Sequence, residues 1–191
     1  MSSITQTRRE SLALAWRRIT AWSIDWLWIL VLPVLLLPIG VILYRTGVRL
    51  PTAAWNVLSF VILVAPVTLW AAWRESGRFQ ATPGKRVRGL VVVGARSMRP
   101  AGFGRALLRN SLKIALPWEL GHTVAFAFAT ASAERIPGYV MVLTILVYMI
   151  MFGWLGTLFL PSARTPYDLL SGTRVIPRPS PGGQPTGPAQ P

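Results

Sequence analysis

Four long runs of apolar residues dominate the chain, and each is long enough to cross a membrane. The hydrocarbon core of a bilayer is about 30 Å thick, which a helix of roughly 20 mainly apolar residues can span. The predicted spans cover residues 22–44, 53–73, 112–131 and 138–160. This pattern predicts an all-α membrane protein, a four-span transmembrane helical bundle.

The third run is more polar than the others, because it contains Glu119 and His122, whereas the second and fourth runs carry no charge. A re-entrant or interfacial helix over residues 112–131 is the alternative interpretation. It would leave three spans and would place the two ends of the chain on opposite sides of the membrane.

The regions that flank these runs differ in character. A signal peptide has an apolar region of about 7–15 residues that ends at a small-residue cleavage site, and the first run is longer and contains Asp25. We therefore expect an uncleaved first span after an N-terminal arm at residues 1–15. The membrane domain would cover residues 16–176, and the Pro/Gly-rich residues 177–191 would form a disordered tail.

The chain is strongly basic, with 20 Lys and Arg against 6 Asp and Glu, and a net charge of +14. Its mean hydropathy is nevertheless +0.47. If both ends face the cytoplasm, 17 basic residues lie inside and 3 outside, as the positive-inside rule requires. We therefore expect a multi-pass protein of the cell inner (plasma) membrane with both termini cytoplasmic.

This positive charge has two interpretations. It follows the predicted topology, and the basic segment between the second and third spans lacks a recognised nucleic-acid-binding fold or a set of aromatic stacking residues. Anionic lipid head groups are the simpler counterpart, so we expect lipid contacts and no nucleic acid. The residues expected to contact lipid or a partner are Lys85, Arg86, Arg88, Arg105, Arg109 and Lys113.

The basic segment also has a predicted internal structure. Thr82 and Pro83 are typical of the start of a short helix, with threonine as N-cap and proline at the first position. Residues 90–93 are typical of a short β-type strand. From Phe103, apolar residues recur at helical spacing opposite Arg105, Arg109 and Lys113, which predicts a basic amphipathic helix on the inner leaflet.

Asp25 is the acid inside the first apolar run. A charge in this setting costs about 2.5–3.5 kcal/mol on insertion scales, so an intramembrane acid is a candidate functional site. Arg18 lies seven positions earlier on the same helical face, with a rise of roughly 10 Å that an extended arginine side chain could largely bridge. The alternative is that Asp25 belongs to a polar cluster that fixes how segments meet at the cytoplasmic side.

Glu119 and His122 have a same-face spacing of three residues, which makes them candidates for a proton path. Alternatively, the two side chains hydrogen-bond to each other. The chain has one histidine and no cysteine, so a di-iron Glu-x-x-His bundle and a Ser/His/Asp triad both lack support. We expect no metal, no cofactor and no enzymatic activity.

Four short stretches resemble the RDD family of bacterial integral membrane proteins, named for one arginine and two aspartates. Residues 18–25 resemble its opening signature with Arg18 and Asp25, and residues 164–173 its closing signature with Asp168. Residues 82–92 and 103–110 resemble its central parts. Most of the family has no determined function, and a member has been linked to sodium/proton antiport.

Three function hypotheses follow, and a membrane enzyme, the third, has the weakest support. The leading one is small-ion transport, as cation/proton antiport, with Asp25 as the exchanging acid and Asp168 as a cytoplasmic second acid. Thr165 to Asp168 also matches a capping box, so the alternative role of Asp168 is structural. The second hypothesis is a non-catalytic membrane organiser that binds a partner or anionic lipid through its basic segment. A homo-oligomer or a membrane partner is expected.

Overall fold

The computed structural model describes residues 2–130 and 136–179 and is mostly helical. The longer helices are α1 (Ser2–Arg45), α2 (Thr52–Ser59), α3 (Ala65–Glu75), α5 (Phe103–Asn110), α6 (Leu116–Thr130) and α7 (Gly138–Thr157). The short elements are α4 (Pro83–Val87), β1 (Leu90–Gly94), α8 (Pro166–Leu170) and β2 (Thr173–Pro177). Two π-helical segments, Phe60–Val64 and Ser111–Ala115, connect α2 to α3 and α5 to α6.

Within the described residues, three helical segments are long and apolar enough to cross a membrane, namely Arg8–Arg45, Thr52–Glu75 and Gly138–Thr157. The first, second and fourth predicted spans lie on these segments. The third predicted span lies on the π segment Ser111–Ala115 and on α6, which has 15 residues, and its last residue, 131, lies outside the described part. A four-span topology therefore stays a prediction.

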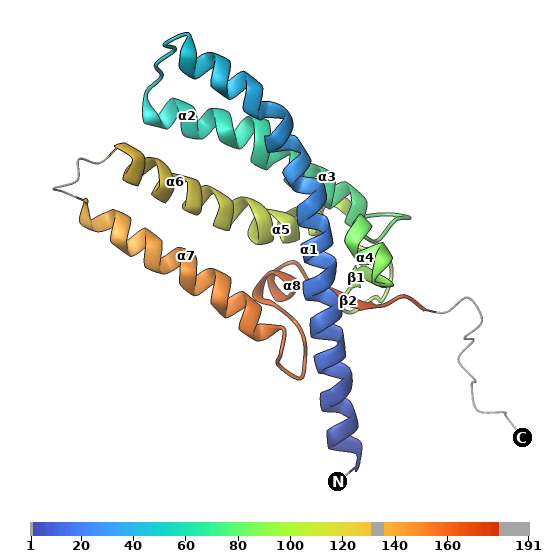
Figure 1. The fold of residues 1–191 in the computed structure, drawn as a ribbon. Helices are drawn as coiled ribbons and strands as arrows, with labels where there is room; N and C mark the ends of the chain where they lie inside the picture. Colours follow the sequence, from blue (N-terminus) through green and yellow to red (C-terminus); the bar gives the residue numbers. More distant parts are fainter. Residues whose placement is uncertain (1, 131–135, 180–191) are drawn as a thin grey trace, which may run out of the picture.

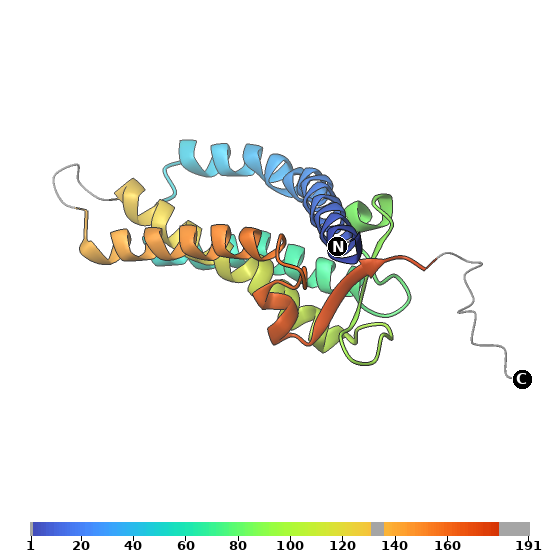
Figure 2. The same cartoon turned by 90° about the horizontal axis from the view of Figure 1, so that it is seen from below.

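The helices α2–α3, α5–α6 and α7 run side by side, with α6 between α2 and α7, while the N-terminal half of α1 crosses them steeply (Figures 1 and 2). Helix α1 begins at Ser2, so the predicted arm is helical and continuous with the first span. Most of the predicted disordered tail, residues 180–191, lies outside the described residues.

Each π-helical segment ends two residues before a proline. Phe60–Val64 precedes Pro66, and Ser111–Ala115 precedes Pro117. Proline has no N–H to donate and its ring collides with the carbonyl four residues earlier, which here is the carbonyl of the third π-helical residue. A widened turn moves that carbonyl away, which explains why the helices continue through both prolines.

The short elements α4, β1, α8 and β2 gather at one end of the long helices, and we call them the cap (Figure 1). Strand β1 pairs antiparallel with β2, with Val92 opposite Val175. The predicted strand at 90–93 is confirmed, and its partner was not predicted. The cap core contains Val92 and Val175 together with Ala21 from α1, so the cap packs directly on the first helix.

Helix α5 differs from its predicted orientation. The pattern placed Phe103 on the apolar face and Arg109 on the exposed face, but Phe103 is 46 % exposed and Arg109 only 1 % exposed. Helix α5 packs against α3 instead of lying free on a leaflet. The reason is electrostatic, because Arg109 meets two buried carboxylates that the local periodicity does not reveal.

Candidate functional site: a buried charge network

Arg18 links the first helix to the C-terminal part of the cap. Its guanidinium forms an ion pair of 2.6 Å with the carboxylate of Asp168 in α8, and it also donates to the carbonyl of Ala163. The predicted approach of Arg18 to Asp25 along α1 is therefore wrong. Arg18 is held instead by Asp168, a partner far away in the sequence.

Asp25 holds α4 against α1. One carboxylate oxygen accepts a hydrogen bond from the hydroxyl of Thr82 at 2.6 Å, and the other accepts from the backbone N–H of Gly84 at 2.8 Å. The Nζ atom of Lys85 lies 3.9 Å from Oδ2 of Asp25. Gly84 lies so close to α1 that a Cβ there would collide with the backbone of Ala21, so glycine permits this contact.

Glu75, at the end of α3, joins these contacts to α5. Its carboxylate pairs with Lys85 at 2.7 Å and with Arg109 at 2.7 Å, and accepts a hydrogen bond from Asn110 at 2.9 Å. Glu75 was not among the predicted site residues. The available signal was that Glu75 is the one acid in the segment 74–113, which carries ten basic residues.

Asp168, in the first turn of α8, completes the network. It pairs with Arg109 at 3.0 Å as well as with Arg18, and it accepts hydrogen bonds from the hydroxyl and N–H of Thr165 at 2.8 and 3.2 Å. The predicted capping box is confirmed. Burial alone would raise the pKa of Asp168, but the Arg109 and Arg18 guanidiniums outweigh burial and lower the pKa to about 2.

Together these side chains form one buried network of three cations and three anions. Its members, each at most 7 % exposed, are Arg18, Asp25, Glu75, Lys85, Arg109 and Asp168. Burial lowers the pKa of Arg109, but the carboxylates of Glu75 and Asp168 outweigh it and raise that pKa above its ordinary value. Each charge of the network therefore faces at least one opposite charge, which offsets the cost of its burial. It contains all three signature residues.

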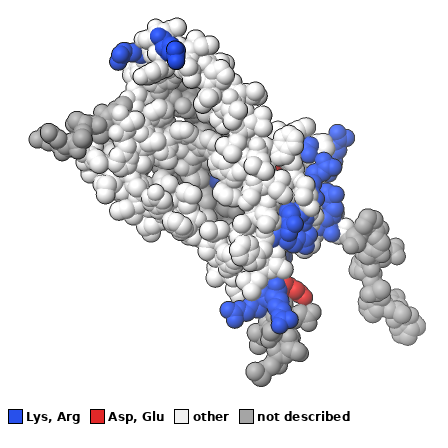
Figure 3. All heavy atoms as spheres, in the orientation of Figure 1, with Lys and Arg blue, Asp and Glu red and all other residues white. Residues whose placement is uncertain are grey.

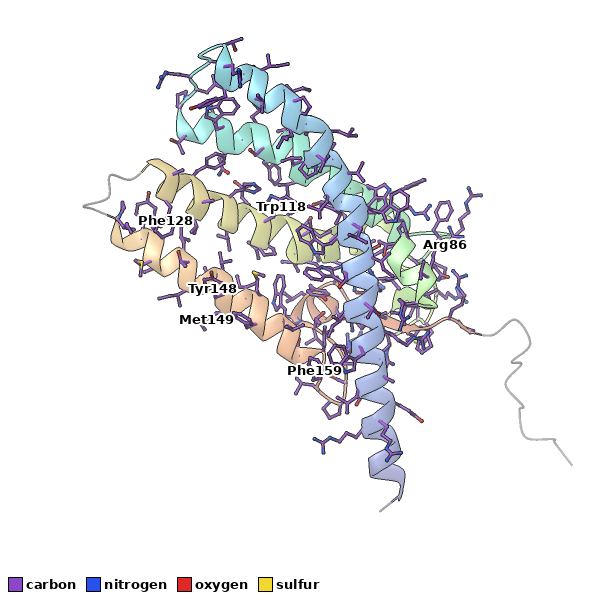
Figure 4. The ribbon with its side chains drawn as sticks, viewed as in Figure 1. Arg86, Trp118, Phe128, Tyr148, Met149 and Phe159 are labelled. Carbon is purple, nitrogen blue, oxygen red and sulfur yellow. The ribbon has the colours of Figure 1, made fainter. Side chains whose placement is uncertain are left out.

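The network changes the expected lipid contacts. Lys85 and Arg109 are buried in it, so the prediction that these two face lipid or a partner is wrong. Arg86, Arg88 and Arg105 are exposed, and Lys113 is half-buried. Basic side chains gather over the cap end of the molecule (Figure 3), and Arg86 lies at the outer edge of α4 (Figure 4).

Glu119 and His122 lie apart from the network and do not bond to each other. Glu119 accepts from Asn56 of α2 at 2.7 Å, and His122 accepts from Trp118 at 3.2 Å. Trp118 lies beside α1 and α2 (Figure 4), where its ring stacks on Trp26 and on His122. One oxygen of Glu119 and the Nδ1 atom of His122 are buried without a hydrogen-bond partner.

Within residues 2–130 and 136–179, no three His, Asp or Glu side chains come together as metal ligands would. The site is thus a set of ion pairs between protein groups at the end of apolar helices.

These helices define a membrane-associated protein. A family model, the RDD family, matches residues 12–172, and the chain belongs to this family. Neither the curated proteins nor the solved structures contain a match.

Proposed function

We propose that this protein is a non-catalytic membrane organiser, which presents a rigid basic face to an anionic membrane surface or to a membrane partner. The observation that carries the proposal is the state of the signature residues. Arg18, Asp25 and Asp168 are buried against opposite charges and hydrogen-bond donors. An exchanging acid must lose and regain a proton near neutral pH, and the pKa of Asp168, at about 2, is far below that range.

The network has a structural consequence that supports this role. It ties α1, α3, α4, α5 and α8 together through six side chains, so the cap is held in one orientation on the helices. The exposed basic side chains of Arg86, Arg88 and Arg105 belong to α4, the residue after it and α5, so the network fixes the elements that carry them. A basic residue near an anionic leaflet contributes about 1 kcal/mol of attraction, so a fixed group of them forms a docking surface.

The topology belongs to the same proposal. We place the protein in the cell inner membrane of a bacterium, with four spans, both termini cytoplasmic and the cap at the inner surface, as a homo-oligomer or with a membrane partner. The basic residues around the cap support this orientation through the positive-inside rule.

Lipid selectivity tests the proposal. Quenching of tryptophan fluorescence by brominated phosphatidylglycerol and brominated phosphatidylcholine, in vesicles that contain the full chain, measures preference for the anionic lipid. We expect a preference that Arg86→Gln/Arg88→Gln/Arg105→Gln weakens while the unfolding temperature stays the same. Equal quenching by both lipids in the unchanged protein, together with cation-driven collapse of a pH gradient, would overturn the organiser.

Small-ion transport, as cation/proton antiport, is the second candidate. Glu119 favours it, because this carboxylate lies between apolar helices, has an unpaired oxygen and forms no ion pair among the described residues. The test is pH-gradient collapse in proteoliposomes on addition of sodium, potassium or lithium. Collapse that Glu119→Gln abolishes and Asp25→Asn leaves intact would support transport through this acid.

A further inference from the structure

Two arginines and two aromatic rings form a cluster where α3 ends. The guanidinium carbon of Arg74 lies 4.5 Å from the ring centre of Phe79, and that of Arg78 lies 4.8 Å from the same ring. Trp73 packs edge-on against Phe79, with ring centres 5.4 Å apart. We call these four residues the arginine–aromatic cluster.

The cluster carries positive charge that no described carboxylate neutralises. Among the described residues, no carboxylate forms an ion pair with Arg74 or Arg78, and the neighbouring Glu75 is held by Lys85 and Arg109. The Nε atom of Arg74 is buried and has no hydrogen-bond partner. Two guanidiniums against one ring raise the local positive potential.

The setting of the cluster indicates which anion it meets. The segment Thr52–Glu75 is long and apolar enough to cross a membrane, and the cluster lies where this segment ends. The side chain of Trp73 is 53 % exposed, and tryptophan is enriched where a membrane meets water. Arginine stems lie along apolar surface while their charged ends reach the head groups. The cluster therefore lies at the depth of lipid phosphates.

We propose that the arginine–aromatic cluster binds the phosphate of one anionic phospholipid. The planar donor fork of arginine matches phosphate geometry. The ring of Phe79 contacts both guanidiniums, and the ring of Trp73 contacts that of Arg74, so the rings hold the donors in place. The site rests on the proposed function, because that function places the protein against an anionic surface. Its residues are separate from those of the basic face. Its ligand would be a single retained lipid.

Native mass spectrometry of the full chain in detergent tests the proposal by titration with phosphatidylglycerol and phosphatidylcholine. We expect Arg74→Gln/Arg78→Gln to weaken phosphatidylglycerol binding by about tenfold. The matched control, Arg96→Gln/Arg99→Gln, removes the same charge from two exposed arginines and should leave binding unchanged. Phe79→Leu keeps both charges and should cause a smaller loss of affinity, which provides a second variant if the double substitution fails to fold.

Three results would overturn the site. An equal loss of phosphatidylglycerol affinity in the two double-arginine variants would mean that the lipid is attracted by basic charge in general. Displacement of the lipid by millimolar inorganic phosphate would mean that the cluster binds a free anion. If the basic face still selects anionic lipid and the Arg74 and Phe79 variants bind phosphatidylglycerol normally, the proposed function stands and this site fails. If the basic face shows no preference for anionic lipid while the Arg74 and Phe79 variants lose affinity for phosphatidylglycerol, this site stands and the proposed function fails.

Discussion

Arg18 and Asp168 are 150 positions apart in the chain, yet a 2.6 Å ion pair joins them inside the protein. The arginine belongs to the first helix and the aspartate lies in the first turn of α8 in the cap. This contact joins α1 to the rest of the network, because Asp168 also pairs with Arg109, which in turn pairs with Glu75. Each signature residue therefore has a structural partner that lies on a different element.

Replacement of Arg18 by glutamine should destabilise the protein by about 3–5 kcal/mol, the range for removal of one partner from a buried ion pair. The lower end applies, because Asp168 keeps Arg109 as a partner. Chemical unfolding in detergent micelles measures the loss. Arg9→Gln, at an exposed position of the same helix, is the matched control and should change stability little.

Replacement of Glu75 by glutamine should cost more stability than Arg18→Gln. The carboxylate faces both Lys85 and Arg109, so its loss leaves two buried cations close together without this anion. The same unfolding assay applies, with Arg96→Gln as an exposed control. If Glu75→Gln were as mild as the control, the network would not hold the cap.

Substitution of Gly84 by alanine should separate α4 from α1. The added Cβ would collide with the backbone of Ala21, and the displacement would break the hydrogen bond from the Gly84 N–H to Asp25. Gly104→Ala is the control, since its Cβ would meet nothing within 4 Å on a helix. We expect a large loss of thermal stability at position 84 and a neutral or slightly stabilising effect at position 104.

Acid should weaken the network through Asp168. Its pKa is about 2 in the folded protein and 3.8 ordinarily, so its contribution to stability is complete above about pH 4 and is lost as the pH falls toward 2. Linkage makes this contribution about 2 kcal/mol. Unfolding temperatures measured from pH 7 to pH 3 should fall less steeply for Asp168→Asn than for the unchanged protein. Parallel curves would contradict the assignment.

The sequence predicted the elements that depend on local pattern. Apolar runs predicted three of the membrane-length helices, residues 90–93 predicted β1, and Thr165 with Asp168 predicted the start of α8. Each signal lies within one short stretch, so periodicity and capping chemistry suffice to detect it.

The contacts between distant segments could not be predicted in the same way. The sequence spacing suggested that Arg18 would approach Asp25, whereas the fold brings Asp168 to Arg18 and Thr82 to Asp25. The periodicity of α5 placed Arg109 outside, because the pattern contains no information about two carboxylates from α3 and α8. Long-range ion pairs override the local tendency of a charged residue to face solvent.

A double-mutant cycle on Arg18 and Asp168 measures whether these two signature residues stabilise the fold through their ion pair. Unfolding free energies are measured for Arg18→Gln, Asp168→Asn and both together. We expect a coupling of about 1–3 kcal/mol, so that the double variant loses less stability than the two single variants combined. Additive losses, or single variants as stable as the unchanged protein, would contradict it.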